Sequence, residues 1–433
     1  MKLILILIVL FSFSLANARE MFIVNTISTT LGRVDLTTFV ANNDFVQIGY
    51  WANDVVLHED YLYVVNSANG TVQVINSTNG QSREIELEDG SSPSRILVHG
   101  GFAYVTGLIT GKLYKIDLSN TSNIEYIEVG TSPGGLLIVD DKIFVALTGF
   151  LSYDEETNIS DFEPGIVAVI DLNDFSFIKN VDVSINPQEL LADSHGNIHV
   201  LCTGNYNDIP TEIVIFCSED FEPIETITFE SSFTTIQLGI SGMVYLGGGF
   251  GMSFEDDEMV FASGLGSYNP ETFEILHDGI DLLVAGGQKL LYDEKYIYVL
   301  LSGDYREING TLIVLNHDFE ILEEVELGLG ALAMALKGGT TSVADVVRPN
   351  TLEILSYPNP FISHVQFEVK GNRSDVRLEI FNVRGQRVYE TTGNNPSWNG
   401  IDRNGRVAPA GVYFARISDS NENMAVRRIM RIK

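Results

Sequence analysis

The sequence predicts an all-β protein, a seven-bladed β-propeller followed by a small β-sandwich. Three observations carry this prediction. Residues 19–345 contain no convincing amphipathic helix. A strand of similar pattern recurs seven times at intervals of 40–55 residues, and such a period is typical of propeller blades with four strands each. The last 80 or so residues differ in pattern and in the sign of their charge.

The recurring strand begins with an aromatic residue or a histidine. Its seven copies start at Phe22, Tyr63, Tyr104, Phe144, His199, Tyr245 and Tyr298. A second strand ending near Asp or Asn follows each copy, as at Thr71–Asn76, and a third strand ends at a Gly turn, as at Gly90. A short apolar strand, as at Ile96–Val98, then leads into the next repeat. We therefore expect four strands in each blade.

The two ends of the repeat region predict how the ring closes. The chain after residue 18 enters the recurring strand directly, so the first blade lacks one strand. Ala331–Leu336 is a spare apolar strand after the seventh repeat. Pairing of these two segments in one blade closes the ring and leaves no open sheet edge.

The first 18 residues predict a secretory signal peptide. Met1-Lys2 is a short basic region, Leu3–Leu15 is apolar, and Ala16-Asn17-Ala18 is a small-x-small site, so cleavage is expected after Ala18. The alternative is a single membrane anchor, but about 13 apolar residues are fewer than the roughly 20 that span a bilayer. No later segment approaches a transmembrane run.

Charge divides the rest of the chain. Residues 351–433 hold 12 Lys and Arg against 8 Asp and Glu, a net charge of +4, which leaves 14 against 50, or −36, for residues 1–350. We predict a propeller at residues 19–337, a linker at 338–352 and a sandwich domain at 353–433. The total of −32 argues against nucleic-acid binding, because a basic surface is needed to neutralise phosphates.

Two ordered motifs mark the C-terminal domain. They are Tyr357-Pro358-Asn359-Pro360-Phe361 and Gly411-Val412-Tyr413-Phe414, followed by a basic strand at Met424–Lys433. This block resembles the C-terminal sorting domain of type IX secretion cargo, which is related to the immunoglobulin-like domain of flagellar hook-capping proteins. The resemblance implies an immunoglobulin-like β-sandwich that outer-membrane secretion machinery recognises. It also implies a protein secreted from, or held on the outer surface of, a Gram-negative bacterium. The alternative is an accessory sandwich that no secretion machine reads.

The units at Tyr63–Gly80 and Tyr104–Asn120, with turns at Pro93 and Pro133, resemble the YVTN-type propeller repeats of bacterial and archaeal surface proteins. This resemblance implies a propeller fold and an extracellular setting. It carries no activity, because one fold hosts many functions.

No catalytic motif is present. His195 and His199 are interpreted as a turn residue and a strand residue, since the seven His form no HExxH. Cys202 and Cys217 are expected in neighbouring strands, too far apart along the hairpin for bridge geometry, with a disulfide as the alternative. No cofactor is evident.

Two long insertions interrupt the repeat, at Gly149–Pro164 in blade four and Phe250–Val260 in blade six. Both fall on the loop between the second and third strand, so they are expected on one face of the ring. The candidate binding residues are Tyr153, Asp154, Glu155, Glu156, Phe254, Glu255, Asp256, Asp257 and Glu258. Carboxylates suit Ca²⁺ and exposed aromatic rings suit apolar ligand faces, so the hypothesis names a divalent cation, a cationic group or a glycan. A protein ligand is also left open. The alternative is loops solvated by their own charges.

The favoured function is a non-catalytic binding propeller with an unknown surface ligand. The alternatives are a propeller enzyme, lactonase- or lyase-like, and a surface scaffold. An enzyme would line the channel mouth with converging His, Asn and carboxylates. The turns that enter the innermost strands hold only scattered residues of these types, Asn53, Asp54, Asn186 and Asp281, which favours the binding interpretation.

Overall fold

The computed structural model describes most of the chain after the predicted signal peptide, whose residues 1–18, including Ala18, lie outside the described part. The described residues are 19–154, 159–205, 208–239, 242–248, 251–255, 258–262, 264–280, 287–317, 319–338, 353–370, 376–382, 387–393, 396–403, 405–418 and 424–432. The chain forms two compact units, residues 1–346 and 347–433. None of the described residues belongs to a helix long and apolar enough to cross a membrane.

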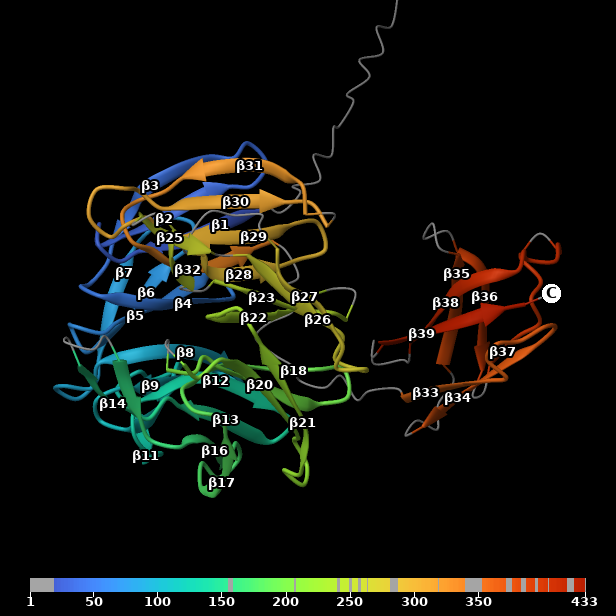
Figure 1. The fold of residues 1–433 in the computed structure, drawn as a ribbon, viewed down its shortest axis with the longest axis horizontal. Helices are drawn as coiled ribbons and strands as arrows, with labels where there is room; N and C mark the ends of the chain where they lie inside the picture. Colours follow the sequence, from blue (N-terminus) through green and yellow to red (C-terminus); the bar gives the residue numbers. More distant parts are fainter. Residues whose placement is uncertain are drawn as a thin grey trace, which may run out of the picture. The chain divides into compact units, whose positions relative to one another are not determined.

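The main body of the first unit, in its described part, consists of seven four-stranded antiparallel sheets (Figure 1). Their innermost strands are β32 (Ala331–Lys337), β4 (Ala52–His58), β8 (Pro93–His99), β12 (Pro133–Val139), β18 (Pro187–Ala192), β22 (Thr235–Leu238) and β28 (Gly287–Tyr292). The second strands are β1 (Glu20–Asn25), β5 (Tyr61–Asn66), β9 (Phe102–Gly107), β13 (Lys142–Leu147), β19 (Asn197–Cys202), β23 (Val244–Gly247) and β29 (Ile297–Leu301). Each second strand contains one copy of the recurring sequence pattern, as predicted.

Two further strands complete each sheet toward the rim. The third strands are β2 (Thr30–Asp35), β6 (Thr71–Asn76), β10 (Lys112–Asp117), β16 (Gly165–Asp171), β20 (Thr211–Cys217), β26 (Leu265–Tyr268) and β30 (Thr311–Leu315). The outermost strands are β3 (Val40–Gln47), β7 (Ser82–Glu86), β11 (Ile124–Glu128), β17 (Phe177–Val183), β21 (Pro223–Phe229), β27 (Ile275–Ile280) and β31 (Ile321–Glu326). Consecutive innermost strands contact one another around a closed cycle from β32 through β28 and back to β32. The first unit is therefore a β-propeller.

Apolar residues on both faces of each sheet hold neighbouring sheets together. In β5, Leu62 and Val64 belong to the core shared with the first sheet, whereas Tyr63 and Val65 belong to the core shared with the third. Side chains alternate between faces along a strand, so a strand buried on both faces reads as an almost continuous apolar run. This requirement explains why the recurring strand is the clearest signal in the sequence.

The first sheet is built from both ends of the unit. β1 pairs with β2 on one side and with β32 on the other, with Met21 opposite Leu336 and Ile23 opposite Met334. The predicted closure by residues 331–336 is therefore observed.

Arg19 adds a second connection between the first and last sheets. Its guanidinium forms an ion pair with Asp293, whose side chain is fully buried, and donates a hydrogen bond of 3.1 Å to the Tyr298 hydroxyl. The same guanidinium lies 5.6 Å from the ring centroid of Tyr296. The Arg19 carbonyl accepts the backbone N–H of Leu36 at 2.9 Å. A charge-assisted contact thus joins the start of the propeller to its last sheet.

Loops from two places in each repeat share one face of the ring. Gly49, before β4, donates its backbone N–H to the Asn66 side chain after β5 at 3.1 Å, and Gly328 makes the same bond to Asn25 at 3.2 Å. A Cβ at Gly49 would lie 2.6 Å from the Asn66 side chain, so only glycine allows this approach. We call this side, which holds the loops into the innermost strands and the loops after the second strands, the channel face.

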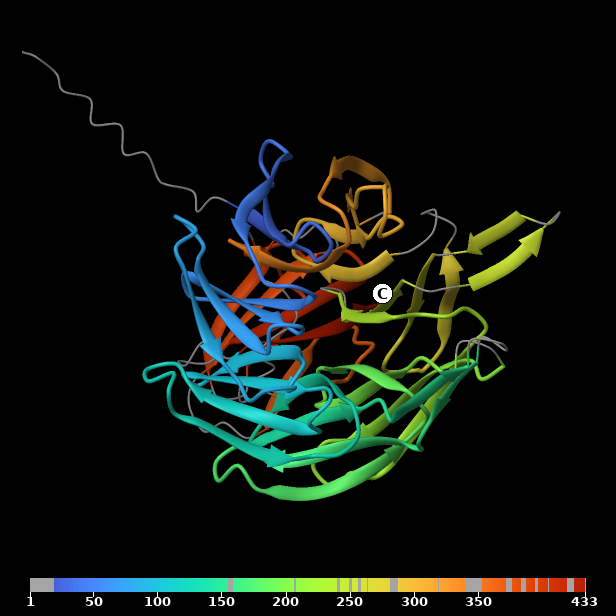
Figure 2. The same ribbon diagram turned by 90° about the vertical axis from the view of Figure 1, so that its left-hand side faces the viewer.

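Both predicted insertions are hairpins on the channel face. β14 (Phe150–Asp154) pairs with β15 (Ile159–Phe162), and β24 (Gly251–Glu255) pairs with β25 (Glu258–Ala262). In Figure 2 the β24–β25 hairpin, in yellow, projects away from the ring.

The second unit is a β-sandwich of two sheets. One sheet has the order β33 (Glu353–Tyr357), β34 (Val365–Lys370) and β37 (Ser397–Trp398). The other has the order β36 (Arg387–Gly393), β35 (Val376–Asn382), β38 (Gly411–Ser418) and β39 (Met424–Arg431). Their inner faces share one apolar core that includes the fully buried Trp398. On the outer face Glu379 is buried, and Arg387 and Arg416 each donate to it at 2.6 Å.

The Arg19 contact predicts a specific loss of stability. Arg19→Gln leaves the buried carboxylate of Asp293 without its cation, so the free energy of unfolding of the propeller should fall by on the order of 3 kcal/mol. The control is Arg33→Gln, because Arg33 is a partly exposed arginine of the same sheet, 3.6 Å from Glu20, and should cost less than about 1 kcal/mol. Urea denaturation of both variants measures this. Equal small losses for the two would contradict the assigned role of Arg19.

Candidate functional site

Irregular pairing at the start of the innermost strands turns side chains toward the centre of the ring. The register of β4 on β5 shifts between Ala52 and Asp54, and similar shifts occur at the start of β8, β12, β18, β28 and β32. A bulge places an extra residue in one strand and redirects the next side chain. The third residue of four of these strands is charged: Asp54, Arg95, Glu189 and Lys289. We call these four residues the channel cluster.

The channel cluster lines a cavity of about 200 Å³ in the channel of the propeller. Its walls come from the innermost strands, the loop before β22 and the loop after β19. The lining residues are Asn53, Asp54, Arg95, Gln188, Glu189, Thr203, Thr234, Lys289, Leu332 and Ala333. The hydroxyl of Thr234 is buried and has no hydrogen-bond partner in the structure. The cavity is therefore small, polar and provided with charges of both signs.

Asp54 and Glu189 make equivalent contacts, because each accepts a hydrogen bond from the next sheet. Asp54 accepts the backbone N–H of Ile96 at 3.2 Å, and Glu189 accepts that of Ile236 at 3.1 Å. In each case the acceptor and donor belong to the innermost strands of adjacent sheets. One function of these carboxylates is thus structural, because they join neighbouring blades at the channel wall.

The two cations differ in their partners. Lys289 forms an ion pair with Glu189. Among the residues with described positions, no carboxylate lies within ion-pair distance of Arg95, whose guanidinium donates one long hydrogen bond of 3.3 Å to the Ser94 carbonyl. Most of the five N–H donors of Arg95 therefore have no partner among the described residues.

The carboxylates also differ in pKa. Burial raises the pKa of Asp54 above its usual value, and the more distant positive charges of Arg95 and Lys289 oppose this only in part. Burial acts on Glu189 in the same direction, but Lys289 and Arg95 outweigh it and hold the pKa of Glu189 below its usual value. The pair with Lys289 accounts for the difference.

Large apolar side chains are exposed on loops around the channel mouth. Tyr50 and Trp51, in the loop before β4, are 66% and 68% exposed. The others on this face are Ile27, Ile109, Phe150, Leu151, Tyr153, Ile209, Tyr305 and Ile308. Exposed apolar patches are a feature of interaction surfaces. As many large apolar residues of the propeller are exposed elsewhere, mainly on the outermost strands, so exposure alone does not single out this face.

The predicted binding residues are described only in part. Tyr153, 53% exposed, and Asp154 lie in β14, and the backbone of Phe254, Glu255 and Glu258 lies in β24 and β25. Glu155, Glu156, Asp256 and Asp257 lie outside the described residues. Within the described part of the chain, no three His, Cys, Asp or Glu side chains converge to hold a metal ion. Ca²⁺ binding by these loops remains a prediction.

The sequence interpretation of the histidines and cysteines is confirmed where the structure describes them. His199 is buried, with one ring nitrogen 2.7 Å from the Tyr268 hydroxyl and the other 3.3 Å from Asp193. Cys202 is opposite Glu212 and Cys217 is opposite Asn197, so the cysteines lie at opposite ends of a strand pair and are free. Burial raises the pKa of the Cys202 thiol well above its usual value, which makes it unreactive.

The two C-terminal motifs contribute both core and surface. Phe361 is buried, with its ring centroid 5.5 Å from that of Trp398. The Asn359 side chain donates a hydrogen bond to the Arg428 carbonyl and accepts one from the Met430 N–H, both in β39. Tyr413 is buried and donates its hydroxyl proton to the Pro409 carbonyl at 2.7 Å. Tyr357 and Phe414 are 49% and 39% exposed. Exposed members of the motifs are available to a partner, whereas the buried ones hold the sandwich together.

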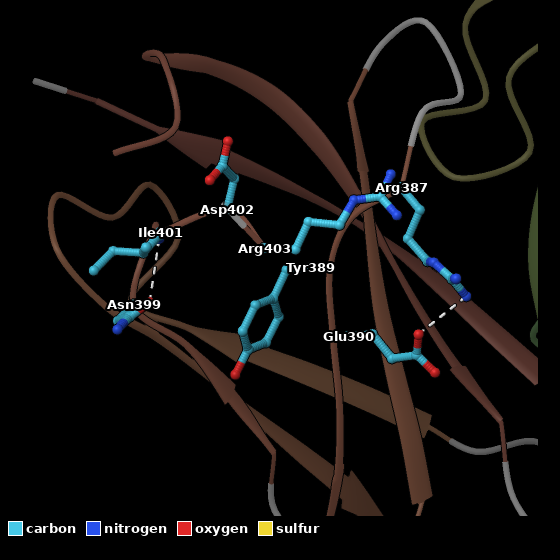
Figure 3. A pocket seen from close by; sticks show the side chains of 7 residues that line it. All are labelled: Arg387, Tyr389, Glu390, Asn399, Ile401, Asp402 and Arg403. Carbon is cyan, nitrogen blue, oxygen red and sulfur yellow. Dashed lines mark hydrogen bonds and ion pairs between the residues drawn. The ribbon is translucent and has the colours of Figure 1, made fainter. Parts of the chain in front are cut away.

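The sandwich has a cavity of its own, of about 290 Å³ (Figure 3). Seven residues line it: Arg387, Tyr389, Glu390, Asn399, Ile401, Asp402 and Arg403. Arg387 pairs with Glu390 at 3.1 Å, and Ile401 donates its backbone N–H to Asn399. Some of the polar groups that line this cavity are thus already paired with one another.

Comparison with known proteins identifies the C-terminal domain. Residues 362–429 match the model of the CHU_C type IX secretion signal domain. The chain therefore carries a type IX secretion signal domain, which implies export to the cell surface or release. No curated protein matches the chain in sequence.

Solved structures resemble the propeller at low sequence identity. Hydrazine synthase of Kuenenia stuttgartiensis matches with a TM-score of 0.53 and 14% identity over 66% of this chain and 89% of that one. A streptogramin B lyase matches with a TM-score of 0.51 and 12% identity over 67% of this chain and 89% of that one. At such identities the likeness concerns the fold alone.

Sequence reasoning found Asp54 in the channel but missed Arg95, Glu189 and Lys289. A signal was present, because each is a single charged residue before an apolar run, as in Arg95-Ile96-Leu97-Val98. A charged side chain at the third residue of a buried strand would enter the apolar core unless it faces a channel or a partner. A single charge at this position therefore indicates such a surrounding.

The two carboxylates predict opposite responses to neutralisation. The raised pKa of Asp54 means that the folded protein favours the neutral carboxyl. The free energy of unfolding therefore falls as the pH rises from the carboxyl pKa of the unfolded chain to that of Asp54 in the fold. Asp54→Asn should therefore leave stability at pH 7 unchanged or raise it by about 1 kcal/mol or less.

Glu189→Gln should do the reverse. The lowered pKa of Glu189 stabilises the fold above the carboxyl pKa of the unfolded chain, and this contribution is lost as the pH falls. The variant also leaves Lys289 unpaired, so it should cost about 1–3 kcal/mol at pH 7 and less near pH 4. Denaturation at both pH values measures the contrast. A loss for both variants at pH 7 would contradict it.

Proposed function

We propose that this chain is a secreted or cell-surface binding protein whose propeller holds a ligand at the channel face. The type IX signal at residues 362–429 and the predicted signal peptide support two-step export. The observation that carries the binding role is the coincidence on one face of a polar cavity, a charged wall and exposed aromatic residues. Ligand pockets combine a concave shape with a few charged or polar groups that fix orientation.

Export involves a partner that reads the C-terminal domain. We assign the role of this partner to the outer-membrane secretion machinery of a Gram-negative bacterium. Tyr357 and Phe414 are the exposed motif residues that it could contact. The immunoglobulin-like relationship of this domain and the YVTN-type character of the propeller repeats belong to the same proposal. They rest on the quoted sequence motifs.

A propeller enzyme, lactonase- or lyase-like, is the second candidate. The observation that favours it is Asp54, a channel carboxylate whose pKa is raised by burial although Arg95 and Lys289 lie within electrostatic range. Perturbed carboxylates in clefts are typical of acid–base groups. The binding role is preferred because Asp54 and Glu189 already accept hydrogen bonds that join adjacent blades.

The export role predicts where a truncated chain stops. A chain lacking residues 353–433 should still cross the inner membrane, because its signal peptide is intact, but should stay in the periplasm of a host with a type IX system. Cell fractionation and immunoblotting measure this. The matched control is the full chain carrying Arg83→Gln, which changes the propeller rim and should be exported normally. Release of the truncated chain at the level of the full chain would contradict the proposed export.

A further inference from the structure

Arg95 and Asp54 are two charges of opposite sign that the channel wall does not pair with each other. They occupy equivalent third positions on the innermost strands of adjacent sheets. Their side chains are within electrostatic range, yet no ion pair joins them, while Lys289 and Glu189 across the cavity neutralise one another. The cavity therefore presents one available cation and one available anion.

The hydrogen-bonding capacity of both groups is only partly used. Arg95 donates one long bond, to Ser94, and its planar fork matches a carboxylate in a bidentate arrangement. Each oxygen of Asp54 accepts one backbone N–H, from Val55 at 2.9 Å and from Ile96 at 3.2 Å, so each can accept another donor. The partner that satisfies both is a molecule with a carboxylate and an ammonium group.

The remaining lining fits a small polar molecule. The cavity volume of about 200 Å³ is below the roughly 300–1,000 Å³ of pockets that hold drug-sized ligands. Thr234 adds a buried hydroxyl without a partner, which is costly unless a ligand or water satisfies it. Leu332 and Ala333, on the innermost strand next to that of Asp54, supply a short apolar wall.

We propose that the channel cavity binds a small zwitterion of the amino-acid class, with the carboxylate on Arg95 and the ammonium on Asp54. This inference rests on the proposed binding function and names the ligand class for its site. Burial raises the pKa of Asp54 and the charges of Arg95 and Lys289 oppose this only in part, which agrees with a carboxylate that lacks a close cation.

Thermal-shift measurement and calorimetric titration of the full mature chain test this. Each standard amino acid is added singly, and the one that binds best is compared with its analogues lacking the amino or the carboxyl group. The inference expects one ligand per chain and binding at least about tenfold weaker for each analogue. Failure of every amino acid to bind at millimolar concentration would overturn it. Equally tight binding of either analogue would also overturn it, because a single charge would then suffice.

Variants locate the site. Arg95→Gln should weaken binding at least about tenfold, and Asp54→Asn should weaken it while keeping an acceptor for Ile96. Arg83→Gln, in the exposed strand β7, is the matched control and should bind normally. If Arg95→Gln does not fold, Asp54→Asn alone decides the point. Unchanged affinity in the folded variants would overturn the assignment.

Export of the same variants by the native host separates this inference from the proposed function. Normal export without zwitterion binding overturns the ligand class alone. Failure of the unaltered chain to leave the cell overturns the proposed function.

Discussion

The pairing of β1 with β32 is the contact on which the rest of the propeller depends. It joins residues 20–25 to residues 331–337 in one sheet and so closes the cycle of innermost strands. A propeller sheet is buried on both faces by its neighbours, so an open ring would expose the apolar faces of two sheets as well as two strand edges. Arg19 supplements the closure from the same end of the chain through its ion pair with Asp293. Backbone pairing, apolar packing and one buried charge pair thus act at the same junction.

Closure also creates the candidate site. Asp54, Arg95, Glu189 and Lys289 are far apart in the sequence and share only their position in the repeat. The ring brings equivalent positions together at its centre, and the bulges turn these side chains into the channel. The two carboxylates then serve the fold, by accepting N–H groups of the next blade, and among the described residues Arg95 has no carboxylate partner. Asp54, which stabilises the channel wall, and Arg95, which is available to a ligand, thus lie on the innermost strands of adjacent sheets.

The parts of the structure that follow a local pattern could be predicted from the sequence. The strands at Tyr63 and Tyr104 are buried on both faces, which imposes apolar runs, and the turn residues between them set the period. The insertion at Phe150–Phe162 was predictable because it breaks that period. The channel cluster as a whole was harder to predict, since the signal of a single charge, as in Pro187-Gln188-Glu189-Leu190, acquires meaning only when the strand is known to be innermost and bulged. Glu155 and Asp257 lie outside the described residues, so ligand binding by the two acidic insertions remains a prediction from the sequence.

Hydrogen exchange of the full mature chain tests the closure most directly. If the ring is held by the β1–β32 pairing, the amides of β1 should be protected as strongly as those of β5, β9 and β13, because they open only when the propeller unfolds. The paired amides of β32 should be protected as strongly as those of the innermost strands β4, β8 and β12. Exchange of the paired β32 amides well before those of the other innermost strands, with the other sheets still protected, would contradict this account. In that case the last strand would be a dispensable addition to an open array of sheets.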